Sequence, residues 1–244
     1  MRLTGFYTQG NKWVAMCYST LTMTINGVGQ PVFREAGDDP QRLCRIFRKI
    51  LRFTVFISFP AMFGFAIVSP QLITIAITDK WIDCVPVMQI LCVWGAFMPV
   101  STLYGNLFNA INRPGIYMWT TISLGLLQLL CVVGSYRFGL NVMLMVYTVL
   151  NILWLLVWQR SAFRCIGLRL RDVLADISPY LFISATVIGF TEFVTKGIAN
   201  NFLALGAKIA MAATLYFLVM KLIGASEIEE VKEYFKKKKI DEDA

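Results

Sequence analysis

Long apolar runs alternate with short polar segments along the whole chain. A run of about 20 mostly apolar residues is long enough for an α-helix to cross the ~30 Å hydrocarbon core of a bilayer. Seven such runs are present, and each predicts a transmembrane helix. The predicted fold is therefore all-α, a polytopic membrane bundle of about seven helices. The runs are residues 13–33, 53–77, 85–110, 116–134, 140–158, 173–194 and 202–223.

Composition agrees with a membrane protein. Of the 244 residues, 57% are hydrophobic and only 16% are charged, and the mean hydropathy is +0.62. The transmembrane bundle is expected to occupy residues 1–225, followed by a cytoplasmic tail at 226–244 that is basic and amphipathic. In that tail, Ser226 and Glu229 form a capping-box pattern that indicates a further helix.

Histidine is absent, and the six cysteines form no C-x-x-C pair. His-based catalytic triads and the common zinc sites are therefore not predicted. The cysteines are interpreted as small buried apolar residues. No catalytic residue, metal site or cofactor is expected.

Basic residues gather in alternate loops between the predicted spans. Cytoplasmic loops carry an excess of Lys and Arg, so this pattern predicts a cytoplasmic C-terminus and an N-terminus on the outer side. The stretch before the second span is also expected to form an amphipathic segment that leads into it. The basic loops contain Arg34, Arg42, Arg45, Arg48, Lys49, Arg52, Arg113, Arg160, Arg164, Arg169 and Arg171, whereas the other loops contain Lys80, Arg137 and Lys196.

The first run, which includes "YSTLTMTINGVGQPVF", is more polar than the others. A helix of this composition is expected to face a cavity or other helices rather than lipid. If it begins near Thr4, Lys12 lies about two turns inside it, with Tyr7 close by. Lys12 is then either an anchor at the membrane interface or a ligand for an anionic substrate.

Charged residues are scarce within the other runs. Glu192 and Lys208 are each expected near the outer end of a span, where a long side chain can reach the interface. In the third run Asn106 and Asn109 lie one turn apart, and hydrogen bonding between helices is the simpler interpretation of this pair.

Several segments occur in an order and spacing that resemble a known family. They are "GFYTQGNKW", "QPVFREAGDDPQRLCRIFRK", "FISFPAMFGFAIVSPQLITIAITDKWIDCVPVMQIL" and "LFNAINRPG". Together they resemble the Wzx-type polysaccharide flippases of the MOP superfamily, which export O-antigen and capsule repeat units. The resemblance covers about 115 residues. The chain departs from the family pattern at Arg34, where Ser is usual, and at Asp79, where Gly is usual.

This resemblance implies flipping of an undecaprenyl-pyrophosphate-linked oligosaccharide across the bacterial inner membrane by alternating access. In the related lipid II flippases, a basic residue 19 positions before the loop proline helps to hold the pyrophosphate, and Lys12 lies 19 positions before Pro31. Family members have roughly twice as many spans. The chain is therefore expected to correspond to a C-terminal half, the second bundle of a MATE-like fold. The expected substrate-binding residues are Lys12, Tyr7, Asn26, Gln30, Asn106 and Asn109.

Two other functions stay open at this point. A membrane-embedded enzyme of envelope assembly needs a positioned base or metal ligands, and Asp79 and Asp83 are the only nearby paired acids in an outer loop. A protein that is not an enzyme is therefore predicted. A non-transporting scaffold or remnant subunit fits the same pattern. The expected partners are the lipid-linked oligosaccharide, membrane lipids, and a separate N-terminal half or glycan-polymerase machinery, but not nucleic acid.

Overall fold

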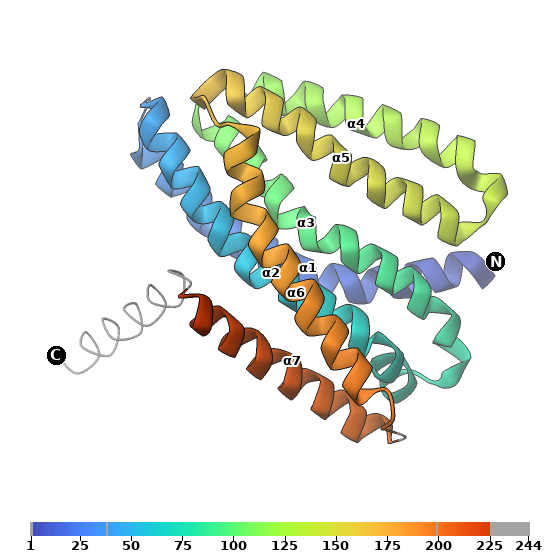
Figure 1. Cartoon of the computed structure of the whole chain (residues 1–244). Coiled ribbons are helices and arrows are strands. Elements are labelled where there is room, and N and C mark those ends of the chain that lie inside the picture. The colour runs from blue at the N-terminus through green and yellow to red at the C-terminus, as the bar shows by residue number, and fades with distance from the viewer. Residues whose placement is uncertain (1, 38, 199, 225–244) are drawn as a thin grey trace.

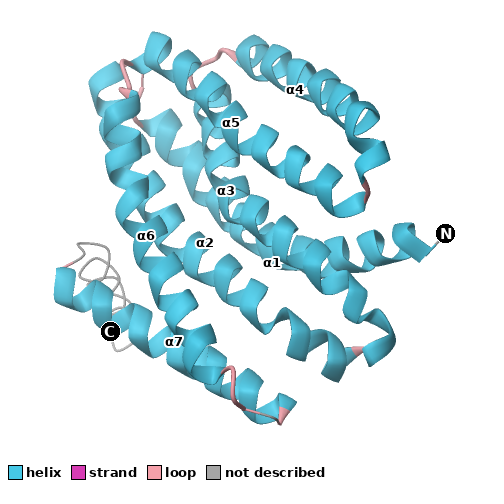
Figure 2. Cartoon of the chain, turned by 45° about the vertical axis from the view of Figure 1, so that its right-hand side comes forward, coloured by secondary structure: helices cyan, strands magenta, loops and turns pink. Residues whose placement is uncertain are grey.

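The computed structural model describes residues 2–37, 39–198 and 200–224, and every regular element in this part of the chain is helical (Figures 1 and 2). The predicted all-α fold is confirmed. The predicted tail helix at 226–244 lies outside the described residues. The helices are α1 (Arg2–Glu35), α2 (Pro40–Ala76), α3 (Val85–Ala110), α4 (Pro114–Ser135), α5 (Leu140–Ile166), α6 (Leu170–Thr195) and α7 (Asn201–Ile223), with short 3₁₀ segments η1 (Asp79–Cys84) and η2 (Tyr136–Phe138).

Six of these described helices, α2 to α7, are long and apolar enough to cross a membrane. The chain is therefore a multi-pass membrane protein. Helix α1 is not among the six because Ser, Thr, Asn and Gln lower its hydropathy. Helix α1 begins at Arg2, which confirms the longer alternative, a first helix that starts near Thr4 rather than at residue 13. Lys12 therefore lies well inside it.

Helix α2 joins the predicted amphipathic segment and the second span in one helix of 37 residues. Asp39 caps its N-terminus, since its carboxylate accepts a hydrogen bond from the Gln41 backbone N–H at 2.9 Å. Pro40 occupies the first turn, where its missing N–H would have no partner within the helix in any case.

The helices pack around α2 and α3. Helix α1 lies along α3, α2 contacts α3, α6 and α7, and the α4–α5 hairpin joins the rest chiefly through α5 and α3 (Figure 1). The α1–α3 contact is close because small residues face it. A Cβ atom added at Gly10 would lie only 3.2 Å from side-chain atoms of Val87 and Met88.

A bidentate ion pair joins α2 to α6 near one end of the bundle. The Arg48 guanidinium donates from Nε and Nη2 to the two carboxylate oxygens of Asp176, at 2.6 and 3.0 Å. Asp176 is only 6% exposed, so without Arg48 its carboxylate would be a buried charge with no compensating cation in this ion pair. Sequence analysis identified Arg48 only as one of the basic residues that indicate the membrane orientation, and it did not identify Asp176 as its partner.

Lys208 also differs from the expectation. Its side chain is 3% exposed and does not reach for the interface. Instead, the ammonium lies 2.7 Å from the Glu192 carboxylate and donates to the Ile67 carbonyl and to Gln71 Oε1, at 2.9 and 3.2 Å. These partners replace the water that a cation loses on burial, so Lys208 fastens α7 to α2 and α6.

Two prolines inside α2 each leave a backbone carbonyl without its helical hydrogen bond, and side-chain hydroxyls donate to these carbonyls instead. Proline removes the hydrogen bond to the carbonyl four residues earlier. The carbonyl of Phe56, freed by Pro60, accepts from the Tyr216 hydroxyl of α7 at 2.8 Å. The carbonyl of Ala66, freed by Pro70, accepts from the Ser69 hydroxyl at 2.8 Å.

A double-mutant cycle tests the role of Tyr216. We expect Tyr216→Phe to lower the free energy of unfolding by about 1 kcal/mol, because the Phe56 carbonyl then has no partner. In a Pro60→Ala background the backbone N–H of residue 60 supplies that partner, so the same substitution is expected to cost much less. Unfolding of the purified chain in detergent, followed by circular dichroism, measures both values. Equal losses in the two backgrounds would contradict this account.

Candidate functional site

Three amide side chains meet between α1 and α3. Asn106 Nδ2 donates to Asn26 Oδ1 at 3.0 Å, and Gln30 Nε2 donates to Asn106 Oδ1 at 3.2 Å. Asn106 is 4% exposed, whereas Asn26 is exposed and Gln30 is half-buried. The predicted interhelical hydrogen bonding is therefore confirmed for Asn106. The two residues on α1 therefore stay accessible while they hold Asn106.

Glycine allows these helices to come together here. A Cβ atom at Gly29 would lie 3.2 Å from Asn106 Nδ2, and one at Gly105 would lie 2.8 Å from the ring of Tyr117. A larger residue at either position would push an amide or an aromatic ring out of place. The local sequence thus sets the spacing of the polar groups as well as their identity.

The amide cluster forms one side of a cavity of about 420 Å³ between α1, α3 and the start of α4. The structure therefore brings four of the six predicted site residues together. Amide and hydroxyl groups make up most of its wall, which is unusual in a bundle as apolar as this one. The lining residues are Asn26, Gln30, Thr102, Gly105, Asn106, Asn109 and Tyr117.

Lys12 does not belong to this cavity. It is exposed on α1, 14 positions before Asn26, which corresponds to ~21 Å along a helix that rises ~1.5 Å per residue. A ligand that contacts both Lys12 and the amides must therefore extend along α1.

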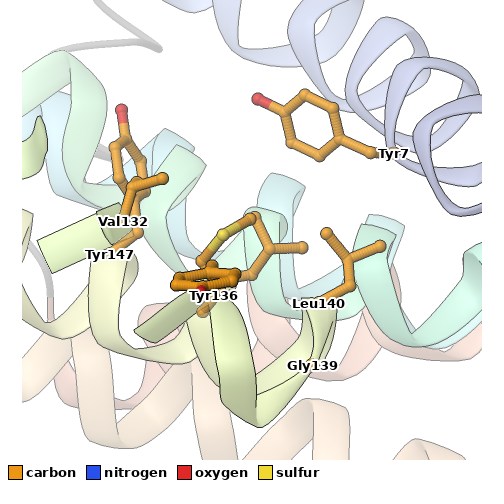
Figure 3. A pocket seen from close by; sticks show the side chains of 8 residues that line it. Tyr7, Val132, Tyr136, Gly139, Leu140 and Tyr147 are labelled. Atoms are coloured by element: carbon orange, nitrogen blue, oxygen red, sulfur yellow. The ribbon is translucent and has the colours of Figure 1, made fainter. Parts of the chain in front are cut away.

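Tyr7 lies in a separate cavity of about 410 Å³ between α1 and the α4–α5 hairpin. Figure 3 shows Tyr7 across from Tyr136, Leu140 and Tyr147. The Arg137 guanidinium lies 5.9 Å from the centroid of the Tyr136 ring, a distance typical of a cation–π contact. Sequence reasoning missed Tyr136 and Tyr147, since no local pattern links them to a residue so far away along the chain.

The basic loops lie at one end of the bundle. The ends of α1, α3 and α5 and the starts of α2, α4 and α6 meet there, at the upper left of Figure 1. The described residues contain no group of three or more His, Cys, Asp or Glu side chains that could hold a metal ion. The groups that the site does offer are amides, hydroxyls and an exposed ammonium. Such groups can hydrogen-bond to polar ligands and attract anionic ones.

Comparison with known proteins adds independent information on residues 1–86. They match a family model described as "Polysaccharide biosynthesis protein". A lipopolysaccharide biosynthesis protein, WzxC, from Escherichia coli (strain K12) is 34% identical over 96 residues, which make up 39% of this chain and 20% of that protein. A membrane protein in the cps region of Klebsiella pneumoniae is 33% identical over 92 residues, 38% of this chain and 19% of that protein.

The matched segment thus spans about a fifth of the length of these curated relatives. No solved structure matches the chain. The family match includes all of α1 and α2, and with them Lys12, Asn26 and Gln30. The predicted resemblance to the Wzx-type polysaccharide proteins is therefore confirmed for the N-terminal third of the chain, residues 1–86.

Proposed function

We propose that the chain forms one wall of a path along which a lipid-linked oligosaccharide crosses the bacterial inner membrane during polysaccharide or lipopolysaccharide synthesis. The polar cavity around Asn106 is the observation that carries this proposal. It lies in a multi-pass bundle whose first third resembles polysaccharide biosynthesis proteins. A second bundle, from a separate N-terminal half, would supply the facing wall.

The physical task explains why these groups are needed. A sugar head linked through pyrophosphate carries hydroxyls and negative charge, which the hydrocarbon core excludes. Amides at Asn26, Gln30 and Asn109 exchange hydrogen bonds with sugar hydroxyls, and the Lys12 ammonium pairs with the pyrophosphate. The apolar tail stays in the bilayer beside the bundle. No bond in the substrate is made or broken, so no base or metal is required and the protein acts as a transporter.

The proposed orientation follows from charge. The end of the bundle with the basic loops faces the cytoplasm, with the end of α7 on that side and the start of α1 on the outer side. Lys12, in the third turn of α1, then lies toward the outer side, and the amide cavity lies toward the cytoplasm. A substrate moving outward would meet the amides first and Lys12 afterwards.

Replacement of Lys12 tests the pyrophosphate contact. We expect Lys12→Gln to weaken binding of undecaprenyl pyrophosphate to the purified chain in lipid nanodiscs about tenfold, because a charge-assisted hydrogen bond is lost. Lys12→Arg should retain binding, since the charge remains. Lys196→Gln, at another exposed lysine on the outer side, is the matched control and should leave binding unchanged. Equal binding by Lys12→Gln and the unaltered chain would remove Lys12 from the proposal.

Asn109 tests the sugar contact separately. It is half-buried and lines the cavity beside Asn106, so Asn109→Leu removes an amide while the Asn26–Asn106–Gln30 cluster stays in place. We expect binding of an oligosaccharide-bearing pyrophosphate lipid to weaken several-fold, and binding of the same lipid without sugar to stay constant. A loss for both lipids, or for neither, would contradict a role in sugar recognition.

A further inference from the structure

An apolar groove of about 600 Å³ lies between the second half of α1 and the first half of α2. Its α2 wall is formed by Ile46, Ile50, Phe53 and Ile57, which follow one another at helical spacing and are all partly or fully accessible. The α1 wall includes Leu21 and Ile25. This groove is separate from the amide cavity and from the cavity around Tyr7.

The few polar groups of the groove do not change its character. The hydroxyl of Thr24 on the α1 side donates to the Thr20 carbonyl at 3.0 Å within its own helix. Thr54 on the α2 side is 5% exposed, and its buried hydroxyl has no hydrogen-bond partner among the described residues. The one charged side chain of the wall is Lys49, which is exposed. The groove therefore suits an apolar chain with a negative group at one end.

Basic residues continue from Lys49 toward the start of α2. Arg45 and Arg42 lie four and seven positions before Lys49, so the three side chains follow one face of the helix, and all three are exposed. They extend the line of groove residues beyond Ile46. Helix α2 itself contains no acid; Asp39 caps it through the Gln41 N–H, and Glu35 is exposed at the end of α1. Positive charge thus borders one end of the groove.

The length of the groove fits a single leaflet. From Ile46 to Ile57 is 11 positions, or ~17 Å of helix, and half of a ~30 Å hydrocarbon core is ~15 Å. A lipid chain lying in the groove would begin at the basic residues and end near the bilayer midplane. A transmembrane helix from another protein would instead run across the whole bilayer, beyond the end of the groove.

We propose that this groove holds an acyl chain of an anionic phospholipid, with the lipid's phosphate among Arg42, Arg45 and Lys49. Basic groups beside a membrane surface attract anionic lipids, and the groove adds a fixed place for the chain. The site goes beyond the proposed transport function, because it requires neither an oligosaccharide nor movement of a substrate. It would hold α1, the polar helix, in a defined position against α2 within the bilayer.

Photolabelling in a membrane tests this site. The full chain is placed in phosphatidylcholine vesicles doped with either phosphatidylglycerol or phosphatidylcholine that has a diazirine on one acyl chain. Peptide mass spectrometry then gives the ratio of label on Ile25, Ile50 and Phe53 to label on the exposed α4 residues Leu126 and Leu129. We expect this ratio to be about fivefold higher for phosphatidylglycerol, which corresponds to one well-placed charge contact.

Three variants complete the experiment. Lys49→Gln should lower the phosphatidylglycerol ratio about fivefold and leave the phosphatidylcholine ratio unchanged. Ile50→Trp should fill the groove and lower both ratios, while constant α4 labelling shows that the bundle is intact. Lys196→Gln, an exposed lysine at the other end of the bundle, should change neither ratio.

Two results would overturn the proposal. Equal ratios for the two lipids in the unaltered chain would mean that ordinary bilayer lipid passes through the groove without recognition. Label on α4 with none in the groove would mean that protein, such as a second copy of this chain, covers it. Neither result depends on oligosaccharide binding, so this test and the Lys12 test can fail independently.

Discussion

The hydrocarbon core of a membrane contains no water, so each polar group inside it must find its partner within the protein. This constraint accounts for the main tertiary contacts of the bundle. The Tyr216 hydroxyl donates to the carbonyl freed by Pro60, and the buried Lys208 ammonium pairs with the Glu192 carboxylate and donates to the Ile67 carbonyl. Asp176 receives both donors of the Arg48 guanidinium. These contacts join helices that hydrophobic side chains alone would leave free to slide.

Helix α1 differs from the other helices because several of its polar side chains are exposed on the surface of the bundle. Gly10, Val14 and Phe33 are buried against the bundle, whereas Lys12 and Thr20 are exposed, together with the apolar Met16 and Met23. Several of its hydroxyls bond to carbonyls one turn earlier, as Thr20 does to Met16 at 3.1 Å. Its amides and its ammonium retain capacity for a ligand. A helix of this kind is costly against lipid and favourable beside a hydrated path, so α1 suits the wall that it shares with α3 around Asn106.

The sequence predicted the helices well because apolar run length is a local property. The third run was expected at 85–110, and α3 has these bounds, while α7 begins one residue before its predicted start. The unusual polarity of the first run was also visible. That four of the six predicted site residues would line one cavity followed in part from this polarity and from the Asn106–Asn109 spacing.

Contacts between distant helices could not be predicted in the same way. Nothing near Arg48 in the chain indicates Asp176, and nothing near Tyr7 indicates Tyr136, because these pairs depend on how the helices cross. The burial of Lys208 was missed for a related reason. A lysine near the end of a span usually extends its ammonium to the membrane interface. Only the packing of α2 and α6 against α7 shows that the Ile67 carbonyl and the Glu192 carboxylate lie close enough to bind it inside the bundle.

Water access to α1 tests the central claim most directly. In a chain whose six native cysteines are replaced, single cysteines at Lys12, Thr20 and Gly27 on the exposed side of α1 can be compared with cysteines at Leu126 and Leu129 on α4. A membrane-impermeant maleimide, applied to both sides of the membrane, should label the α1 positions rapidly and the α4 positions hardly at all. Equal protection of both helices would show that α1 faces lipid or protein, and the hydrated path would have to be abandoned.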